Sequence, residues 1–132
     1  MPEHPAPTSD ALPWLDAAAL RATVAPGGGC AHCASLVCPG WESVPGPVQA
    51  PRLEPVGTLR DPAEDEPTLA EHHPDGTHYW DALAPVATAF FPYNRCEVWR
   101  CPQCRRGFLQ YLEAGGYYTD HRLRQIDPSL VV

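Results

Sequence analysis

Regular patterns of hydrophobic and polar residues are concentrated in the second half of the chain. Residues 95–101 and 108–112 are rich in β-branched and aromatic side chains in short runs typical of strands, and residues 117–126 form a third such run. The pair Gly115-Gly116 between the second and third runs predicts a turn. Three successive antiparallel strands, a β-meander, are therefore expected at this end of the chain.

Weaker patterns precede the meander. Residues 13–22 predict a short helix, because Pro13 suits the first helical position and Trp14, Leu15, Ala18 and Leu20 form a partly apolar face. A strand is expected over residues 56–60. Residues 85–91 fit either a helical turn or an apolar strand.

Proline separates the two halves of the chain. Twelve of the 17 prolines lie in residues 1–67, and because proline lacks an N–H and fixes φ, this half is expected to contribute few strands. Residues 1–10 read as a flexible leader and residues 39–55 as an irregular, polyproline-like segment with no regular element. The predicted fold is α+β and mostly β, a single domain over residues 1–132 whose irregular half needs an additional constraint such as a metal ion.

The cysteines supply that constraint. Two Cys-x-x-Cys pairs, Cys30/Cys33 and Cys101/Cys104, each place two thiols in a tight turn, and together they can complete the tetrahedron that Zn²⁺ prefers. The N-terminus has neither a basic region nor an apolar run of signal length, so the cytoplasm is the expected compartment. Thiols stay reduced there, which favours metal ligands over a secreted disulfide framework.

The second pair also carries a family resemblance. The run Cys101-Pro-Gln-Cys104, followed by Arg-Arg-Gly, resembles the second knuckle of the zinc-ribbon and rubredoxin group, and Cys30-Ala-His-Cys33 would be the first. This likeness covers the knuckles and about the last 35 residues, and it implies a zinc-ribbon-like site with four cysteine ligands. The 67 residues between the knuckles depart from that group. The segments CPGWE, HPDGTHYW and FPYNRC resemble small uncharacterised bacterial proteins, a likeness that implies no activity.

Two further cysteines, Cys38 and Cys96, repeat the spacing in mirror image, with four residues between each and the nearer pair. We expect buried thiols beside the site, because free cysteine is among the most buried residue types. A six-cysteine binuclear zinc site is the alternative. The spacing of Cys96, Cys101 and Cys104 also matches plant-type [2Fe–2S] proteins, which need a further cysteine downstream that is absent here. Zinc is expected rather than iron, because a cytosolic site with four cysteines commonly holds structural zinc.

Histidines flank a predicted turn. The run Pro-Asp-Gly at residues 74–76 predicts a hairpin that joins strands over residues 68–72 and 77–80. His72, His73 and His78 with Asp75 would give a second, open metal site if they converged, as a hydrolase needs. Neighbouring strand residues point to opposite faces, so we expect ordinary polar side chains beside the turn instead.

Charge narrows the choice of partners. The net charge is −7 and the chain has no lysine, which argues against nonspecific nucleic-acid binding. Residues 95–132 nevertheless carry six arginines against four acids. The arginines around the second knuckle could bind a phosphate or an acidic partner. We favour the alternative that they pair internally with the acidic residues 61–66. These arginines are Arg95, Arg100, Arg105 and Arg106.

Three functional classes follow, in order of preference. The first is a small cytosolic zinc-binding protein with a structural site, acting through protein–protein interaction as a neutralising or adaptor protein. No catalytic triad, phosphate loop or pair of catalytic acids is recognisable, so an enzyme is not favoured. The alternatives are a nucleic-acid-associated zinc ribbon that uses the arginine-rich half, and an iron-binding redox protein. No run is apolar and long enough for a membrane span.

Overall fold

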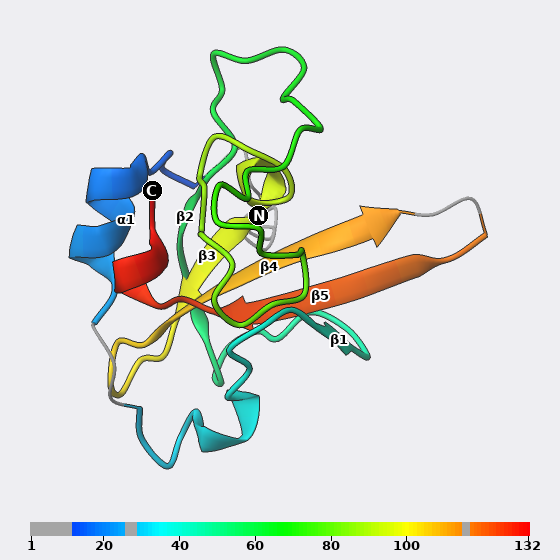
Figure 1. Ribbon diagram of the computed structural model, residues 1–132. Helices are drawn as coiled ribbons and strands as arrows, with labels where there is room; N and C mark the ends of the chain where they lie inside the picture. The colour runs from blue at the N-terminus through cyan, green and yellow to red at the C-terminus, as the bar shows by residue number, and fades with distance from the viewer. Residues whose placement is uncertain (1–11, 26–28, 115–116) are drawn as a thin grey trace, which may run out of the picture.

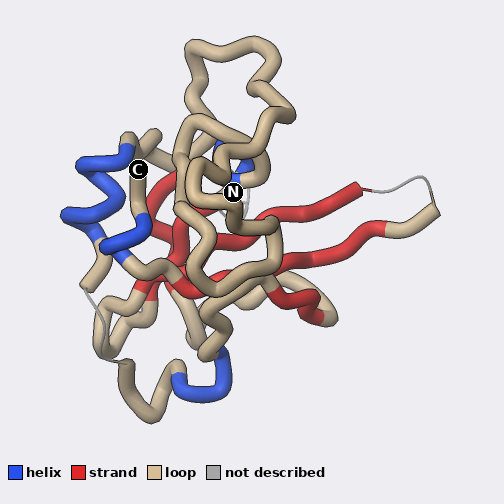
Figure 2. The backbone as a smooth tube through the Cα atoms, in the orientation of Figure 1, coloured by secondary structure: helices blue, strands red, loops and turns tan. Residues whose placement is uncertain are grey.

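The structure, a computed structural model, is built on a five-stranded antiparallel sheet in the order β1-β5-β4-β3-β2 (Figures 1 and 2). It describes residues 12–25, 29–114 and 117–132, so the expected leader and the Gly115-Gly116 turn lie outside the described residues. The elements are α1 (Ala17–Thr23), η2 (Ala34–Leu36), β1 (Glu42–Val44), β2 (Glu54–Thr58), η3 (Tyr93–Arg95), β3 (Glu97–Arg100), β4 (Gly107–Ala114), β5 (Thr119–Gln125) and η4 (Pro128–Leu130). The predicted α+β, mostly β class is confirmed.

The meander is present as β3, β4 and β5, with Trp99 opposite Phe108 and Leu109 opposite Arg124. Strands β4 and β5 form a long hairpin that projects from the body of the molecule in Figure 1. Antiparallel pairing is local in sequence here, which is why the pattern of the isolated segments predicts it well.

Successive strand residues point to opposite sides of the sheet, and each side carries a buried cluster of side chains. Val98 and Leu109 belong to one buried cluster with Leu20 of α1 and Val131 of the C-terminal tail. Their sequence neighbours pack on the other side, in a second cluster with residues from the proline-rich half. The buried members of that second cluster are Cys33, Leu36, Cys38, Val48, Leu53, Trp99, Cys101, Phe108 and Leu123.

Helix α1 begins four residues later than predicted. Leu15 N donates to Thr58 O and Thr58 N donates to Pro13 O, both at 2.9 Å, so residues 13–15 extend alongside β2 instead of entering the helix. Asp16 then caps the helix, with its Oδ1 accepting from Ala19 N at 2.8 Å. The C-terminal tail lies beside α1, where Arg21 donates to Val131 O at 2.9 Å (Figure 1).

The prediction that residues 39–55 hold no regular element is wrong. This segment contains β1 and the start of β2, which extends to Thr58 and not to the predicted Arg60. Both strands lie at the edges of the sheet, where a missing N–H can face away from the ladder, and Pro55 lies within β2. The register shifts between Pro55 and Gly57, so the proline is accommodated at an irregular position.

The predicted hairpin over residues 68–80 is also wrong in part. The turn is present, because Gly76 N donates to His73 O at 3.1 Å and Gly76 has φ of 77°, but neither flank is a strand. The first flank bonds elsewhere: Ala70 O accepts from Phe91 N and Thr68 O from Asn94 Nδ2. Residues 85–91 are mainly turns, apart from a single bridge to the C-terminal tail.

Candidate metal centre

The first knuckle lies in a loop under the sheet, at the bottom of Figure 1. Cys33 N donates to Cys30 O at 3.2 Å, which closes the tight turn, and η2 follows directly. Gly29 precedes the turn with φ of 111°. A Cβ atom there would lie 2.8 Å from the guanidinium carbon of Arg106, so glycine lets the second knuckle approach the first closely.

The second knuckle is the turn between β3 and β4. Cys101 N donates to Arg106 O at 2.9 Å and Arg105 N donates to Cys101 O at 3.0 Å. Arg105 has φ of 67°, the left-handed region that L-residues adopt at a cost. The turn therefore uses a strained residue to bring Cys101 and Cys104 to the same side.

The four sulfurs lie within 4.8 Å of one another. Cys30 Sγ is 3.9 Å from Cys33 Sγ and 3.7 Å from Cys101 Sγ, and the sulfurs of Cys33 and Cys104 are 3.6 Å apart. A tetrahedral ion with metal–sulfur bonds of about 2.3 Å requires sulfur–sulfur separations of about 3.8 Å. A disulfide needs about 2.05 Å. The spacing fits four ligands around one ion and does not fit disulfides.

The electrostatics of the centre suit a divalent cation. Cys33 and Cys101 are fully buried, and burial raises the pKa of the Cys33 thiol. Burial likewise raises the pKa of Cys104 to about 12, whereas a backbone hydrogen bond from Cys33 lowers the pKa of Cys30 to about 7. A bound divalent ion holds such thiols as thiolates. Four thiolates around that ion leave two net negative charges, and the guanidinium of Arg106 lies at the first knuckle.

Cys38 and Cys96 lie outside this group. Cys96 is buried on the opposite face of the sheet from Cys101. The two residues are an odd number of positions apart, and side chains at such positions along a strand point to opposite faces. Its Sγ donates to Pro92 O at 3.3 Å. Cys38 shares the face of the centre, but its Sγ donates to Leu36 O at 2.9 Å. Burial raises the pKa of Cys38 to about 11.

The histidines beside the Pro-Asp-Gly turn do not converge. His73 bonds to Thr77 Oγ1 and to Glu71 Oε1, both at 2.9 Å, and His72 stacks on Phe90 with ring centroids 5.0 Å apart. Within the described ranges, the four cysteines are the one group of three or more His, Cys, Asp or Glu residues with ligand atoms close enough for a metal.

Two of the arginines near the second knuckle, Arg95 and Arg100, bond within the fold, though not to residues 61–66 as expected. Arg100 Nη2 lies 3.2 Å from Glu54 Oε1 across the β2–β3 pair. Arg95 donates to Pro67 O at 3.2 Å and lies over the ring of Phe91. Short-range sequence reasoning missed these partners because strand register and loop paths decide them.

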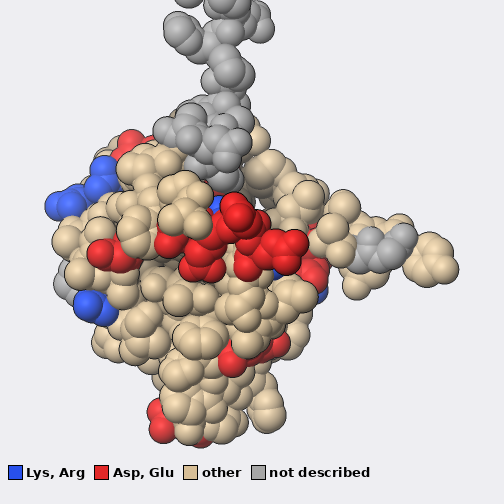
Figure 3. Space-filling view, turned by 90° about the horizontal axis from the view of Figure 1, so that it is seen from above, with Lys and Arg blue, Asp and Glu red and all other residues tan. Residues whose placement is uncertain are grey.

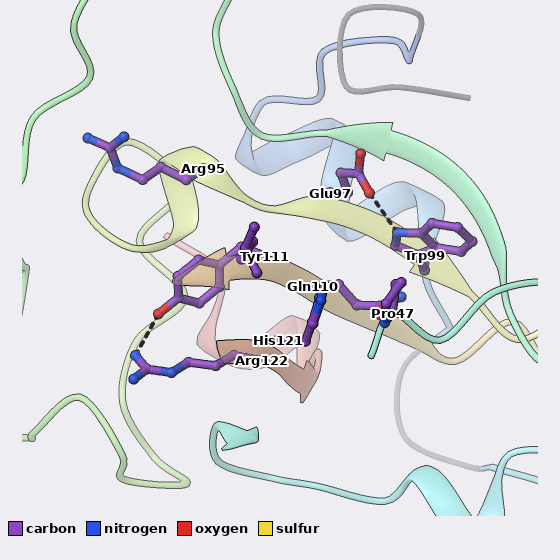
Figure 4. A pocket seen from close by; sticks show the side chains of 9 residues that line it. Pro47, Arg95, Glu97, Trp99, Gln110, Tyr111, His121 and Arg122 are labelled. Carbon is purple, nitrogen blue, oxygen red and sulfur yellow. Dashed lines mark hydrogen bonds between the residues drawn. The ribbon is translucent and has the colours of Figure 1, made fainter. Parts of the chain in front are cut away.

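A hollow of about 350 Å³ lies where β3 begins beside β4 (Figure 4). Arg122 lines it but already donates to Asp120 Oδ2 at 2.9 Å and to the hydroxyl of Tyr111 at 3.0 Å. Glu97, on the opposite wall, accepts from Trp99 Nε1 at 3.2 Å. Because Arg122 is already paired with a carboxylate and Glu97 adds negative charge, the hollow is poorly suited to a phosphate.

Comparison of the chain with protein-family models, with curated proteins and with solved structures finds no match. In the part of the chain that the structure describes, no helix is long and apolar enough to cross a membrane. The geometry of the four thiols is compatible with a zinc-knuckle-like site.

Proposed function

We propose that this protein is a small zinc-binding protein whose four-cysteine centre is structural, and that it acts by binding a protein partner. The observation that carries the metal proposal is the set of sulfur–sulfur separations of 3.6 to 3.9 Å between two turns far apart in sequence. Four sulfur ligands fill a tetrahedral ion and leave no position for water or substrate. The ion then ties the loop after α1 to the β3–β4 turn.

Zinc is proposed over iron because a reduced, cytosolic site with four cysteine ligands most commonly holds structural zinc. Protein purified without added metal should contain one zinc per chain by mass spectrometry of the metals, and little iron. Visible absorption with one iron per chain would replace this proposal with the redox alternative. Two zincs per chain would make ligands of Cys38, Cys96 or the histidines.

The partner is proposed to be a basic protein, neutralised or bridged by this one in the cytoplasm. The net charge of −7 supports this, since complementary charge speeds association and excludes acidic partners. Acidic side chains gather in the middle of one face in Figure 3. Glu64, Asp65 and Glu66, in the loop after β2, are all exposed.

A nucleic-acid role is the weaker candidate. Sequence-independent binding rests on Lys and Arg side chains that neutralise phosphates. Arg124 is 1% exposed and Arg100 and Arg122 pair with carboxylates, so much of the positive charge of residues 95–132 is committed within the fold. Titration with single-stranded RNA and duplex DNA at about 50 mM salt tests this alternative. Binding that weakens steeply as salt rises would favour it.

A further inference from the structure

A hollow of about 230 Å³ lies between the segment that precedes α1 and the loop that follows β2. Three carboxylates line it: Asp16 from the helix cap, and Asp61 and Glu64 from the loop. Trp14, which is 46% exposed, and Asn94 line it as well. Its lining thus combines negative charge, one aromatic ring and one amide with apolar side chains such as Leu15 and Leu59.

Asn94 supplies the observation that points to a ligand. The residue is 4% exposed, and its Nδ2 donates to Thr68 O at 2.8 Å, which fixes the amide so that Oδ1 is the free end. Oδ1 is buried and has no hydrogen-bond partner among the described residues. An acceptor that is buried without a donor is destabilising, so a donor brought to Oδ1 recovers free energy.

The three carboxylates form no ion pair among the described residues, although the Arg60 guanidinium donates to the backbone oxygens of Asp61 and Asp65 in the same loop. Asp16 and Asp61 each accept one backbone N–H with Oδ1, from Ala19 and Ala63. Over residues 12–25, 29–114 and 117–132, none of the three acids forms an ion pair with Arg or His. Nor do their oxygens all lie within the 4.8 Å that a shared metal ion needs, because the described residues give such a group at the cysteines alone.

We propose that this hollow binds the guanidinium group of one arginine side chain of a basic protein partner. Guanidinium offers five N–H donors in a plane, which suits carboxylates from two segments together with the Asn94 oxygen. The hollow is smaller than the roughly 300–1,000 Å³ of drug-sized pockets, so it suits one side chain. Trp14 adds an aromatic surface of the kind that stacks on guanidinium. This inference deepens the proposed function by naming the group recognised on the partner.

The test uses butylguanidinium as the probe and butylurea, its uncharged counterpart of nearly equal shape, as the control ligand. Both are titrated into zinc-loaded, ¹⁵N-labelled full-length protein at about 50 mM salt, where screening is modest. Butylguanidinium should shift the Asn94 side-chain amide and the Trp14 indole signals in a saturable manner, with at least fivefold higher affinity than butylurea. Equal affinity for the two probes would overturn the proposal, as would shifts confined to other parts of the protein.

Matched variants distinguish binding in the hollow from attraction to the overall negative charge of the protein. Glu64→Gln should weaken butylguanidinium binding about threefold, and with Asp61→Asn added about tenfold. Glu66→Gln removes the same charge from the same loop at a residue that does not line the hollow, and should change affinity by less than about 1.5-fold. Equal weakening by Glu64→Gln and Glu66→Gln would refute a specific site. The zinc content of every variant is measured in parallel, so a failure here is distinguishable from a failure of the metal proposal.

Discussion

The side-chain amide of Gln110 forms two hydrogen bonds with the backbone of Val48, 62 residues away in sequence. Val48 N donates to Gln110 Oε1 at 2.8 Å, and Gln110 Nε2 donates to Val48 O at 2.9 Å. Both residues are buried. The amide bonds to both the N–H and the carbonyl of Val48, as the backbone of a neighbouring strand would. It thereby attaches the proline-rich half of the chain to the central strand β4.

Replacing this amide should therefore be costly. Gln110→Met keeps the length of the side chain but leaves two buried backbone groups of Val48 without partners, and should lower the free energy of unfolding by about 2–4 kcal/mol. Urea unfolding in excess zinc measures the loss. Gln49→Met, at the exposed neighbouring position, is the matched control and should change stability by less than about 0.5 kcal/mol. A loss of the same size in both variants would contradict the assigned role of Gln110.

The six cysteines should fall into two groups when each is replaced by serine. Cys104→Ser removes a proposed ligand and should abolish stoichiometric zinc, because metal binding in such sites is coupled to folding by about 10 kcal/mol. Cys38→Ser and Cys96→Ser remove buried thiols outside the cluster, and should retain one zinc while costing about 1–2 kcal/mol. Loss of zinc in either of the latter variants would extend the ligand set.

The free energy of unfolding at alkaline pH should depend on the buried thiol of Cys38. Burial raises the pKa of this thiol from 9.0 to about 11, so the folded state keeps the proton that the unfolded state releases. The resulting stability is fully present below pH 9 and is lost as the pH rises towards 11, by about 2 kcal/mol. Unfolding free energies between about pH 8 and pH 11 should therefore fall more steeply for the wild type than for Cys38→Ala. Parallel curves for the two proteins would show that Cys38 titrates normally.

Two glycines in the proline-rich segment should respond differently to alanine. A Cβ atom at Gly40 would lie 2.6 Å from the backbone oxygen of Trp80, whereas nothing lies within 4 Å of one at Gly46. Gly40→Ala should cost about 1–3 kcal/mol, because backbone must shift to admit the methyl group. Gly46→Ala should be neutral or slightly stabilising, since it restricts the unfolded chain. A melting temperature lowered by Gly40→Ala and not by Gly46→Ala would show that the segment is tightly packed at Gly40 and open at Gly46.

The sequence is informative where chemistry and structure are local. The strands β3 to β5 follow from alternation and short connections, and each cysteine pair is recognisable as a knuckle from its own spacing. The alternation of side chains along β3 also places Cys96 and Cys101 on opposite faces of the sheet, which their positions in the sequence are enough to predict.

Other features depend on contacts between distant segments. Strand β1 and the first residues of β2 lie at edges of the sheet, positions that tolerate nearby proline, which no local pattern of residues 39–55 reveals. The buried amides of Gln110 and Asn94 were missed, although a polar residue at an inward strand position such as Gln110 is a recognisable sign of a buried partner. Charge alone likewise directs Arg95 and Arg100 to residues 61–66, whereas Arg95 donates to the Pro67 carbonyl and Arg100 pairs with Glu54.

Chelation should release the first knuckle before it disturbs the sheet. Within residues 30–37 the backbone hydrogen bonds are short-range, and, among the described residues, the side chains of His32 and Ser35 bond only to residues 51 and 52. The proposed ion is therefore the main polar link between this loop and the sheet. The segment at Val48 remains fastened by Gln110, and β4 pairs with both β3 and β5. Amide exchange measured by mass spectrometry after strong chelation should therefore rise over residues 30–37 first and over residues 107–114 last. Simultaneous exchange in both would indicate one cooperative unit, and unchanged exchange over residues 30–37 would show that no ion joins the two knuckles.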